Sequence, residues 1–442
     1  MKAGLRTFVL LAWPSLAVLL LGLLPLLRTG QVDPRGWMWP ALLLVPAAGL
    51  LKARRGAGAA CWASAGVGGV VLCCAFLATL RVPEAAAVLW LALVVSLATV
   101  AGVAWGYRAT PAKAGVQIDG RNWAPTSRLS RSSAYAGARL WVGLGSILLA
   151  LTACWFADRS RITASARPPE LAVISSLPLF WREGAAGPAA RVDAPIITVL
   201  RQRFAVQPLD SPLLLKPRVK RLLLAQPRAL SGEELVALDR WVRRGGEALV
   251  LADPQLHWPM ALPMGDRRRP PPVTLLAGLL GHWGVGLAPV EAGGGERRHF
   301  LADGRMLTLY AASSVDTVAP ACRILARGLV ARCRVGEGGA TVVADADLID
   351  DRLWLADPAA PLDPRQWTAD TPQYVAQALG AALPGPAHWV RSGPALVQAV
   401  RWAVLIGIFW AALGALLFRT ADRPQFGPAA PRPDSFQRKK RG

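Results

Sequence analysis

Long apolar runs separated by short polar segments occupy the first 157 residues and recur near the end of the chain. A bilayer core about 30 Å thick takes roughly 20 apolar residues as a helix. The run at residues 36–51 is the shortest, but Trp37 and Trp39 would anchor it at a membrane interface. The pattern therefore predicts a membrane protein with about six transmembrane helices, at residues 7–27, 36–51, 59–80, 85–106, 140–157 and 397–418.

Between residues 158 and 395 the pattern changes to short apolar runs that alternate with amphipathic segments, which is typical of an α/β domain. Ser231 and Glu234 have the spacing of a helix capping box, and Gly245 follows that helix as a terminator. Asp303-Gly304 predicts the turn of a hairpin. Strands are predicted at 170–176, 204–208, 219–225, 247–253, 328–335 and 340–344, the hairpin at 296–310, and helices at 196–203, 273–283 and from Thr371 onward.

Basic residues gather in particular loops rather than along the whole chain. The net charge is +22, and Lys and Arg near span ends collect on the cytoplasmic side. The loop after residue 106 and the tail after residue 418 hold many of them, whereas the other short loops hold few. We therefore expect both termini in the cytoplasm, the large domain outside, and a location in the inner (plasma) membrane. The tail at 437–441 could instead be a nucleic-acid patch, but no aromatic residues interleave with it to stack bases, so no nucleic-acid partner is expected.

The division of the chain follows from these patterns. We expect a four-helix transmembrane region, a basic cytoplasmic loop, a fifth span, an extracytoplasmic α/β domain, a sixth span and a basic tail. The corresponding ranges are 1–110, 111–139, 140–157, 158–395, 397–418 and 419–442.

The six cysteines divide between these parts. Four lie in predicted spans, where a thiol behaves as a small hydrophobe. Cys322 and Cys333 fall on neighbouring predicted strands of the outer domain, and an oxidising compartment would let them pair. A disulfide between them is therefore our hypothesis.

Three segments of the outer domain carry a resemblance to a known family. They are residues 171–178, residues 238–254, where a helix, Gly-Gly, a strand and Asp-Pro follow one another, and residues 339–347. Together they resemble the extracytoplasmic domain of gliding-motility-type ABC transporter auxiliary proteins, over about residues 168–390. The resemblance implies a glutamine-amidotransferase-like, flavodoxin-related fold with a mostly parallel sheet. It also implies an accessory of an ABC export system whose ATPase and permease are separate chains.

Catalytic patterns are scarce in the sequence. A hydrolase of this fold needs a nucleophile on a strand-to-helix turn and a His to activate it. The comparable turns carry Ser175-Ser176-Leu177-Pro178 and Asp253-Pro254, without the Gly-x-Cys/Ser-x-Gly pattern. The four His show no metal-ligand spacing, and no phosphate-binding Gly-x-x-x-x-Gly-Lys is present. We therefore expect no enzyme activity, no cofactor and no metal.

Two polar groups remain as candidates for binding. Asp345, Asp347, Asp350 and Asp351 form an acidic cluster, for which a divalent-cation site and the capping of a surface loop are the alternatives, and we favour capping. The long loop after the strand at 247–253 lies where open α/β sheets bind ligands. Its Trp and Arg side chains suit a carbohydrate or an anionic group, although a solvated loop is an equal alternative. The proposed ligand-binding residues are Asp253, His257, Trp258, Arg267, Arg268, Arg269 and Ser176.

The function predicted from sequence is a non-enzymatic membrane component of an ABC-type transport or envelope system, whose outer domain binds a partner or an envelope ligand. The alternatives are a membrane-anchored envelope hydrolase of amidotransferase-like fold and a structural scaffold without a ligand.

Overall fold

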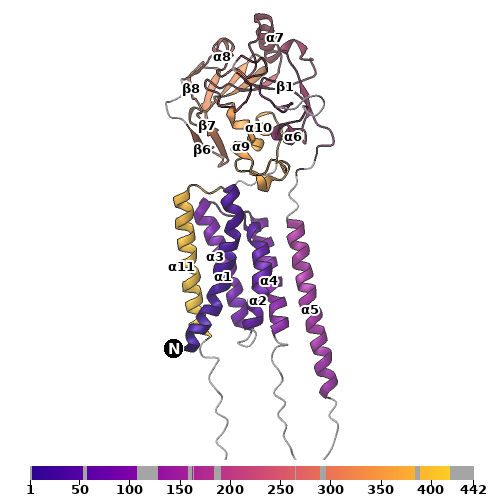
Figure 1. Cartoon of the computed structure of the whole chain (residues 1–442), viewed down its shortest axis with the longest axis vertical. Coiled ribbons are helices and arrows are strands. Elements are labelled where there is room, and N and C mark those ends of the chain that lie inside the picture. The colour runs from indigo at the N-terminus through magenta and orange to yellow at the C-terminus, as the bar shows by residue number, and fades with distance from the viewer. Residues whose placement is uncertain are drawn as a thin grey trace, which may run out of the picture.

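A computed structural model describes residues 2–52, 57–106, 128–157, 162, 164–183, 191–263, 265–288, 295–383 and 389–418. Within these ranges the chain forms a bundle of long helices that carries one α/β domain at one end (Figure 1). The predicted basic tail, most of the predicted basic loop and His388 lie outside the described residues.

The bundle contains α1 (Lys2–Thr29), α2 (Met38–Lys52), α3 (Ala57–Thr79), α4 (Ala85–Gly106), α5 (Arg128–Ala157) and α11 (Gly393–Leu417), with the short η1 (Pro34–Trp37) between α1 and α2. Four of these helices contain an apolar stretch long enough to cross a membrane: Thr7–Thr29, Gly58–Thr79, Ala85–Trp105 and Gly393–Leu417. α2, with 15 residues, and the apolar part of α5, Trp141–Phe156, are both shorter than these four stretches. A membrane-embedded bundle is thus supported, whereas six full spans stay a prediction.

The last helix joins the bundle through paired tryptophans. Trp62 of α3 and Trp410 of α11 stack with ring centroids 4.2 Å apart, and each indole N–H donates to the backbone carbonyl of the other residue. Gly66 and Gly414 lie under these rings, where any Cβ would come within 3.0 Å of the indole. Small residues at such contacts let helices approach closely in a bilayer. The pairing therefore fixes α11 against α3 although 348 residues separate the two tryptophans.

A seven-stranded sheet organises the outer domain, in the order β2-β1-β3-β4-β11-β10-β9. β2, β1, β3, β4 and β11 are parallel, and β10 and β9 continue the sheet in antiparallel pairing. The strands are β1 (Glu170–Ser175), β2 (Ala205–Pro208), β3 (Arg221–Ala225), β4 (Glu247–Leu251), β9 (Cys322–Leu325), β10 (Val330–Val335) and β11 (Gly338–Val343). The prediction of a mostly parallel α/β sheet is therefore confirmed at this level.

Both faces of the sheet are covered, because the central strands alternate their apolar side chains between two cores. In β1, Leu171 and Val173 enter one core, while Ala172 and Ile174 enter the other. The first core includes α6 (Pro195–Leu200), β7 (Met306–Tyr310), α9 (Asp351–Trp354) and α10 (Thr371–Ala378), and the second includes α7 (Gly232–Arg243) and α8 (Ala277–Trp283). Runs that are apolar on both faces are expected for buried parallel strands.

Shorter elements complete the domain. β6 (Glu296–Phe300) and β7 form an antiparallel hairpin, as the sequence predicts, and Gly304 in its turn has φ +82°. β5 (Val285–Leu287) pairs with β8 (Val315–Val318). The remaining single turns are η4 (Pro212–Leu214), η5 (Ala326–Gly328), η6 (Asp347–Ile349) and η7 (Pro364–Gln366).

Local signals in the sequence hold in several places and fail in one. The capping box of Ser231 and Glu234 forms at the start of α7, and Gly245 with φ +89° ends that helix. The helix predicted at 273–283 begins only at Ala277, because the Thr274 N–H donates to the Asp253 carbonyl and holds that part of the chain as a loop.

Hydrogen bonds fasten the outer domain to the bundle. The Gln31 side chain, just after α1, donates to the carbonyl oxygens of Pro364 and Trp367 at 2.8 and 2.6 Å. Val390 N–H donates to the Gly30 carbonyl at 3.0 Å. The domain is therefore attached to the end of α1 as well as through its own chain connections.

Candidate functional site

Several polar residues follow the parallel strands where these strands end. Ser176 follows β1, Gln226 follows β3, and Asp253 and Asp345 come just after β4 and β11. β2 and β3 lie on opposite sides of β1, so the strand order reverses between β1 and β3. Crevices of open α/β sheets form at this edge. The structure thus places the predicted residues Ser176 and Asp253 on the same edge.

Gln226 links these strand ends. Its side chain accepts from the Asp253 N–H at 3.0 Å and donates to the carbonyl oxygens of Asp253 and Pro271 at 3.1 and 3.0 Å. The Ser176 N–H donates to the Gln226 carbonyl at 3.3 Å. Gln226 has φ +39° and is fully buried, a conformation that costs about 1–3 kcal/mol outside glycine. Gln226 belongs to no sequence motif, and its position directly after a buried strand was the one available signal.

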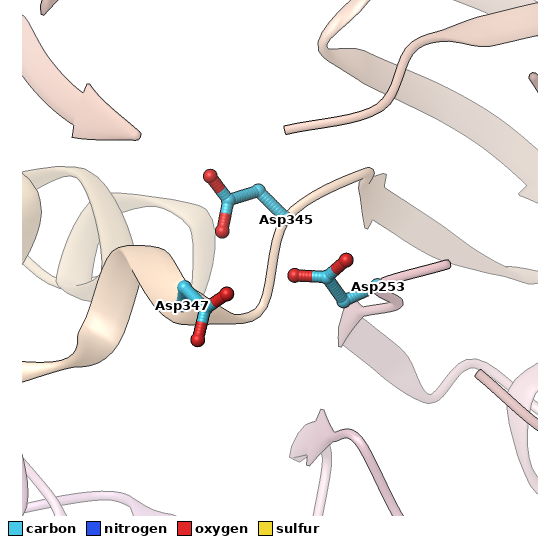
Figure 2. A group of neighbouring side chains, drawn as sticks. All are labelled: Asp253, Asp345 and Asp347. Carbon is cyan, nitrogen blue, oxygen red and sulfur yellow. The ribbon is translucent and has the colours of Figure 1, made fainter. Parts of the chain in front are cut away.

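The central feature is an acid cluster made of Asp253, Asp345 and Asp347 (Figure 2). One carboxylate oxygen from each lies within 4.8 Å of the others. Their exposed fractions are 0%, 0% and 2%. The expected surface location of Asp345, Asp347 and Asp350 is therefore wrong, because all three are buried. The expected capping is confirmed for Asp350, which caps α9, and Asp345 accepts from the Leu348 N–H three residues later.

Backbone N–H groups already occupy most of the carboxylate oxygens of the acid cluster. Both oxygens of Asp253, both of Asp345 and Oδ2 of Asp347 accept such bonds, whereas Oδ1 of Asp347 is buried and has no partner. The donors are Gln255 and Ala346 to Asp253, Leu348 and Tyr310 to Asp345, and His257 to Asp347, at 2.8–3.2 Å.

Burial changes the ionisation of the acid cluster. Desolvation raises the pKa of Asp347 to about 7 and the pKa of Asp253 above its usual range. Desolvation also raises the pKa of Asp345 well above its usual value, and the neighbouring charges of Asp253 and Asp347 add to this effect. Three carboxylates this close cannot all be charged at neutral pH without a compensating cation or proton. The cluster is therefore a place where the fold can hold a proton.

A divalent cation could be held by the three carboxylate oxygens on distance alone. Ca²⁺ takes about 6–8 oxygen ligands, and five of the six carboxylate oxygens of the cluster already accept backbone hydrogen bonds. Protonation of a buried carboxylate is a second way to offset the charge of the cluster, beside a bound cation.

Two predicted loop residues meet the acid cluster. The backbone N–H of His257 donates to Asp347, and the His257 ring lies 5.0 Å from the ring of Tyr310, centroid to centroid. Trp258 is partly buried against the core on the same face of the sheet. Asp253 and His257 are thus brought together through Asp347, which sequence reasoning had assigned to a different group.

The predicted arginines are arranged differently. Arg268 forms an ion pair with Asp266 at 2.8 Å, and Arg269 donates to the carbonyl of Leu262. Arg267 is exposed. Among the described residues, no hydrogen bond or ion pair joins these three side chains to the acid cluster.

Within the described ranges, no serine or cysteine nucleophile is hydrogen-bonded to a histidine that could activate it. There, no hydrogen bond connects Ser176 to a histidine. His282 lies beside Asp239 and Arg243, and His299 lies on β6. The described part of the edge therefore offers a buried acid but no activated serine.

In the structure, Cys322 and Cys333 form a disulfide with an S–S distance of 1.98 Å. The two residues are directly opposite each other on β9 and β10. The bond therefore closes the antiparallel margin of the sheet, away from the acid cluster on β4 and β11.

Comparisons with solved structures give distant similarities. An exo-β-1,4-mannosidase, Op5Man5 from Opitutaceae bacterium strain TAV5, has 16% identity and a TM-score of 0.32, with 58% of this chain and 44% of the enzyme covered. The β-galactosidase Gan42B of G. stearothermophilus has 15% identity and a TM-score of 0.27, covering 48% of this chain and 31% of the enzyme. This chain thus spans less than half of either enzyme, and scores this low support no functional argument.

Sequence comparison gives a more direct result. No curated protein matches the chain, but residues 168–297 match the family described as "ABC-type uncharacterized transport system", an ABC transporter auxiliary family. The matched part runs from β1 into β6 and includes Asp253 with its loop. The resemblance seen in the sequence is thereby confirmed over residues 168–297 of the outer domain, which match the model of this ABC transporter auxiliary family.

Proposed function

We propose that this protein is a non-enzymatic membrane component of an ABC-type transport system, with an outer domain that binds a partner subunit or an envelope ligand. The observation that carries the proposal is the union of an auxiliary-family domain with an apolar helical bundle in one chain. No nucleophile and base pair is assembled within the described ranges, which favours this function over the hydrolase alternative.

The topology that we propose has six spans, both termini in the cytoplasm and the α/β domain outside, in the inner membrane. The direction of the helices supports it. α1 and α3 run toward the outer domain, while α2, α4 and α11 run away from it (Figure 1). α1 begins and α11 ends at the end of the bundle opposite the domain (Figure 1), which is the end that this topology places on the cytoplasmic side.

The junction gives the proposed function a physical route. Gln31 and Gly30 bond to residues 364–367 and 390, and Arg391 N–H bonds to the Ala78 carbonyl at the end of α3. A permease that displaced α1 or α11 would therefore also displace the outer domain. Conversely, a ligand bound to the outer domain could bias the position of those helices.

The loop beyond β4 is the proposed binding surface. Asp253, His257 and Trp258 form its inner part, and Arg267 is exposed in its outer part. Ser176 lies on the same edge of the sheet. The exposed guanidinium groups of Arg267 and Arg268 in this loop suit an anionic group on a partner or an envelope polymer.

The test is affinity purification of the full chain from its host in mild detergent, with protein identification and ATPase assay. We expect an ABC ATPase and a permease in stoichiometric amounts. A tagged multi-span protein of similar abundance gives the background. Replacing Arg267, Arg268 and Arg269 by Gln should weaken recovery if the loop carries the contact, and replacing Arg323, Arg332 and Arg334 by Gln on β9 and β10 gives the matched control.

Absence of both ABC subunits after cross-linking would contradict the proposal. Hydrolysis of an envelope ester, amide or glycoside that disappears in Ser176→Ala, with folding unchanged, would instead establish the hydrolase alternative.

A further inference from the structure

A cavity of about 650 Å³ opens where the bundle meets the outer domain, which we name the junction cavity. Its wall includes the last turn of α1 and the first turn of α11. Both helices are candidate membrane spans, and both spans end at this level, at Thr29 and Gly393. The cavity therefore lies where lipid headgroups surround the protein if these helices cross the bilayer.

Positive side chains dominate the polar lining of the junction cavity. Arg28, Arg298, Arg352 and Arg391 line it, with Glu296 as the one lining carboxylate among the described residues. Arg352 is paired with Asp350. In the same described ranges, the guanidinium groups of Arg28, Arg298 and Arg391 form no ion pair. Three cations therefore face one space with a single carboxylate to offset them.

The fold holds the wall of the cavity in place. Arg298 lies against Gly30, where any Cβ would come 3.4 Å from its Nη2, and its Nη1 contacts the Val390 carbonyl at 3.5 Å. Val390 N–H donates to the Gly30 carbonyl, and Arg391 N–H to that of Ala78. Since these bonds join three segments far apart in sequence, the positive groups are arranged before any ligand binds.

The start of α11 adds to the attraction for an anion. Ser392 caps this 25-residue helix by accepting from the Ala395 N–H, and Ser392 and Gly393 line the cavity. The N-terminal end of a helix carries partial positive charge, which favours phosphate groups. Leu27, whose exposed fraction is 72%, and Leu396 supply apolar surface beside the cations.

We propose that the junction cavity binds the phosphate-bearing headgroup of an anionic phospholipid from the leaflet on the outer-domain side, with its acyl chains along Leu27 and Leu396. Neighbouring charge distinguishes this site from the adjoining 770 Å³ cavity, which also has Leu27 and Arg28 in its lining but in which Arg35 pairs with Asp33 and Glu84. The inference depends on the bundle crossing the membrane and is independent of any ABC partner.

The experiment uses the full chain in detergent, titrated with short-chain phosphatidylglycerol or phosphatidylcholine and analysed by native mass spectrometry. We expect phosphatidylglycerol to bind more tightly than phosphatidylcholine. The double variant Arg28→Gln/Arg391→Gln should weaken phosphatidylglycerol binding by about tenfold or more, because charge-assisted hydrogen bonds are lost. The control Arg240→Gln/Arg244→Gln removes the same amount of charge. Arg240 lies in α7 and Arg244 caps its C-terminal end, and α7 lies on the part of the domain far from the bundle (Figure 1). This control should leave binding unchanged.

The variant Glu296→Gln makes the lining of the junction cavity more positive, whereas the arginine variants make it less positive, and it removes no proposed contact with the lipid. It should tighten phosphatidylglycerol binding a few-fold, since it deletes the lining carboxylate. Equal binding of the two lipids, or equal loss in the α7 control, would overturn the proposal. Binding of inorganic phosphate by calorimetry without any preference for phosphatidylglycerol would assign the cavity to a soluble anion and overturn the lipid assignment.

Discussion

Two regions of this molecule each bring together ionisable side chains of one sign, and they differ in how far these side chains are buried. The acid cluster of Asp253, Asp345 and Asp347 is sealed in the outer domain, with exposed fractions of at most 2%. The junction cavity has four arginines in the lining of a space between the bundle and the outer domain. The burial of a charged group determines whether water, a proton or an ion of opposite charge can offset its charge.

The chemistry of the two groups explains this difference. A carboxylate that loses water can take up a proton and become neutral, and the raised pKa values in the acid cluster express that response. A guanidinium group stays charged in proteins, because its pKa exceeds about 12. The arginines must therefore keep water or meet an anion, which is why an open cavity beside anionic lipid suits them.

The largest predicted effect concerns the proton of the acid cluster. The pKa of Asp347 is raised to about 7 in the fold, above its unfolded value of about 3.9. The contribution of the protonated Asp347 to folding stability is therefore fully present below about pH 4, and it is lost as the pH rises through 7. At about 1.4 kcal/mol per pKa unit, we expect a loss of about 4 kcal/mol between pH 4 and pH 8.

Tryptophan fluorescence during unfolding of the outer domain in the full chain can measure this loss. Asp347→Asn should reduce the dependence of stability on pH between 4 and 8 without abolishing it, because the pKa values of Asp253 and Asp345 are also raised. The exposed Asp316→Asn is the control. Added Ca²⁺ should leave the unfolding midpoint at pH 8 unchanged. A marked rise with Ca²⁺ in the unaltered chain, absent in Asp345→Asn, would show that a metal ion rather than a proton offsets the charge of the cluster.

A smaller effect is expected at the neutral hydrogen bonds of the junction. Gln31→Leu leaves the carbonyl oxygens of Pro364 and Trp367 without their donor. Each unsatisfied buried group costs about 1–3 kcal/mol, so docking of the outer domain should weaken by about 3 kcal/mol. Hydrogen exchange around η7 should speed up, whereas Gln398→Leu on the exposed face of α11 should leave it unchanged. Unchanged exchange in Gln31→Leu would show that these bonds do not hold the domain.

The smallest predicted loss of stability is for Glu234, whose carboxylate is already paired with the guanidinium group of Arg228. Glu234 accepts from Arg228 and from the Ser231 N–H, and these bonds hold its pKa at about 2. Its stabilisation is therefore present above about pH 4.5 and is lost as pH falls through 2. The Arg228 side chain is 51% exposed, so water screens the pair and Glu234→Gln should cost only about 1 kcal/mol at pH 7.

Thermal unfolding at pH 7 and pH 2 can check this value, with the neighbouring exposed Glu233→Gln as the control. A loss for Glu234→Gln as large at pH 2 as at pH 7 would contradict the assignment. The opposite signs expected for Glu234 and Asp347 distinguish a compensated carboxylate from an uncompensated one within a single domain.

Local patterns predicted much of the fold. The apolar runs at 219–225 and 247–253 became β3 and β4, because few other structures bury both faces of so short a run. Ser231 with Glu234 and Asp303-Gly304 also acted as expected, since capping and tight turns depend on neighbouring residues. The start of α8 was misplaced because the Asp253 carbonyl, distant in sequence, holds Thr274.

The candidate site was predicted only in part. Asp253 was found because it follows a buried strand, but its partners Asp345 and Asp347 lie about 90 residues later in the chain. Aspartates after a strand commonly cap exposed turns, so sequence alone favoured the surface for them. The side chains of Gln226 and Gln31 carry no motif, and their roles arise from carbonyl groups brought to them by folding.

The sequence by itself determined that apolar helices embed this chain in a membrane and that an α/β domain of auxiliary-family type lies between the last two of them, because hydrophobic period and turn chemistry are local properties. Only the tertiary structure decided that three aspartates share one buried site and that four arginines share one cavity at the junction. Electrostatic energy depends on distance and on exclusion of water, and both are fixed only when segments far apart in the chain pack together.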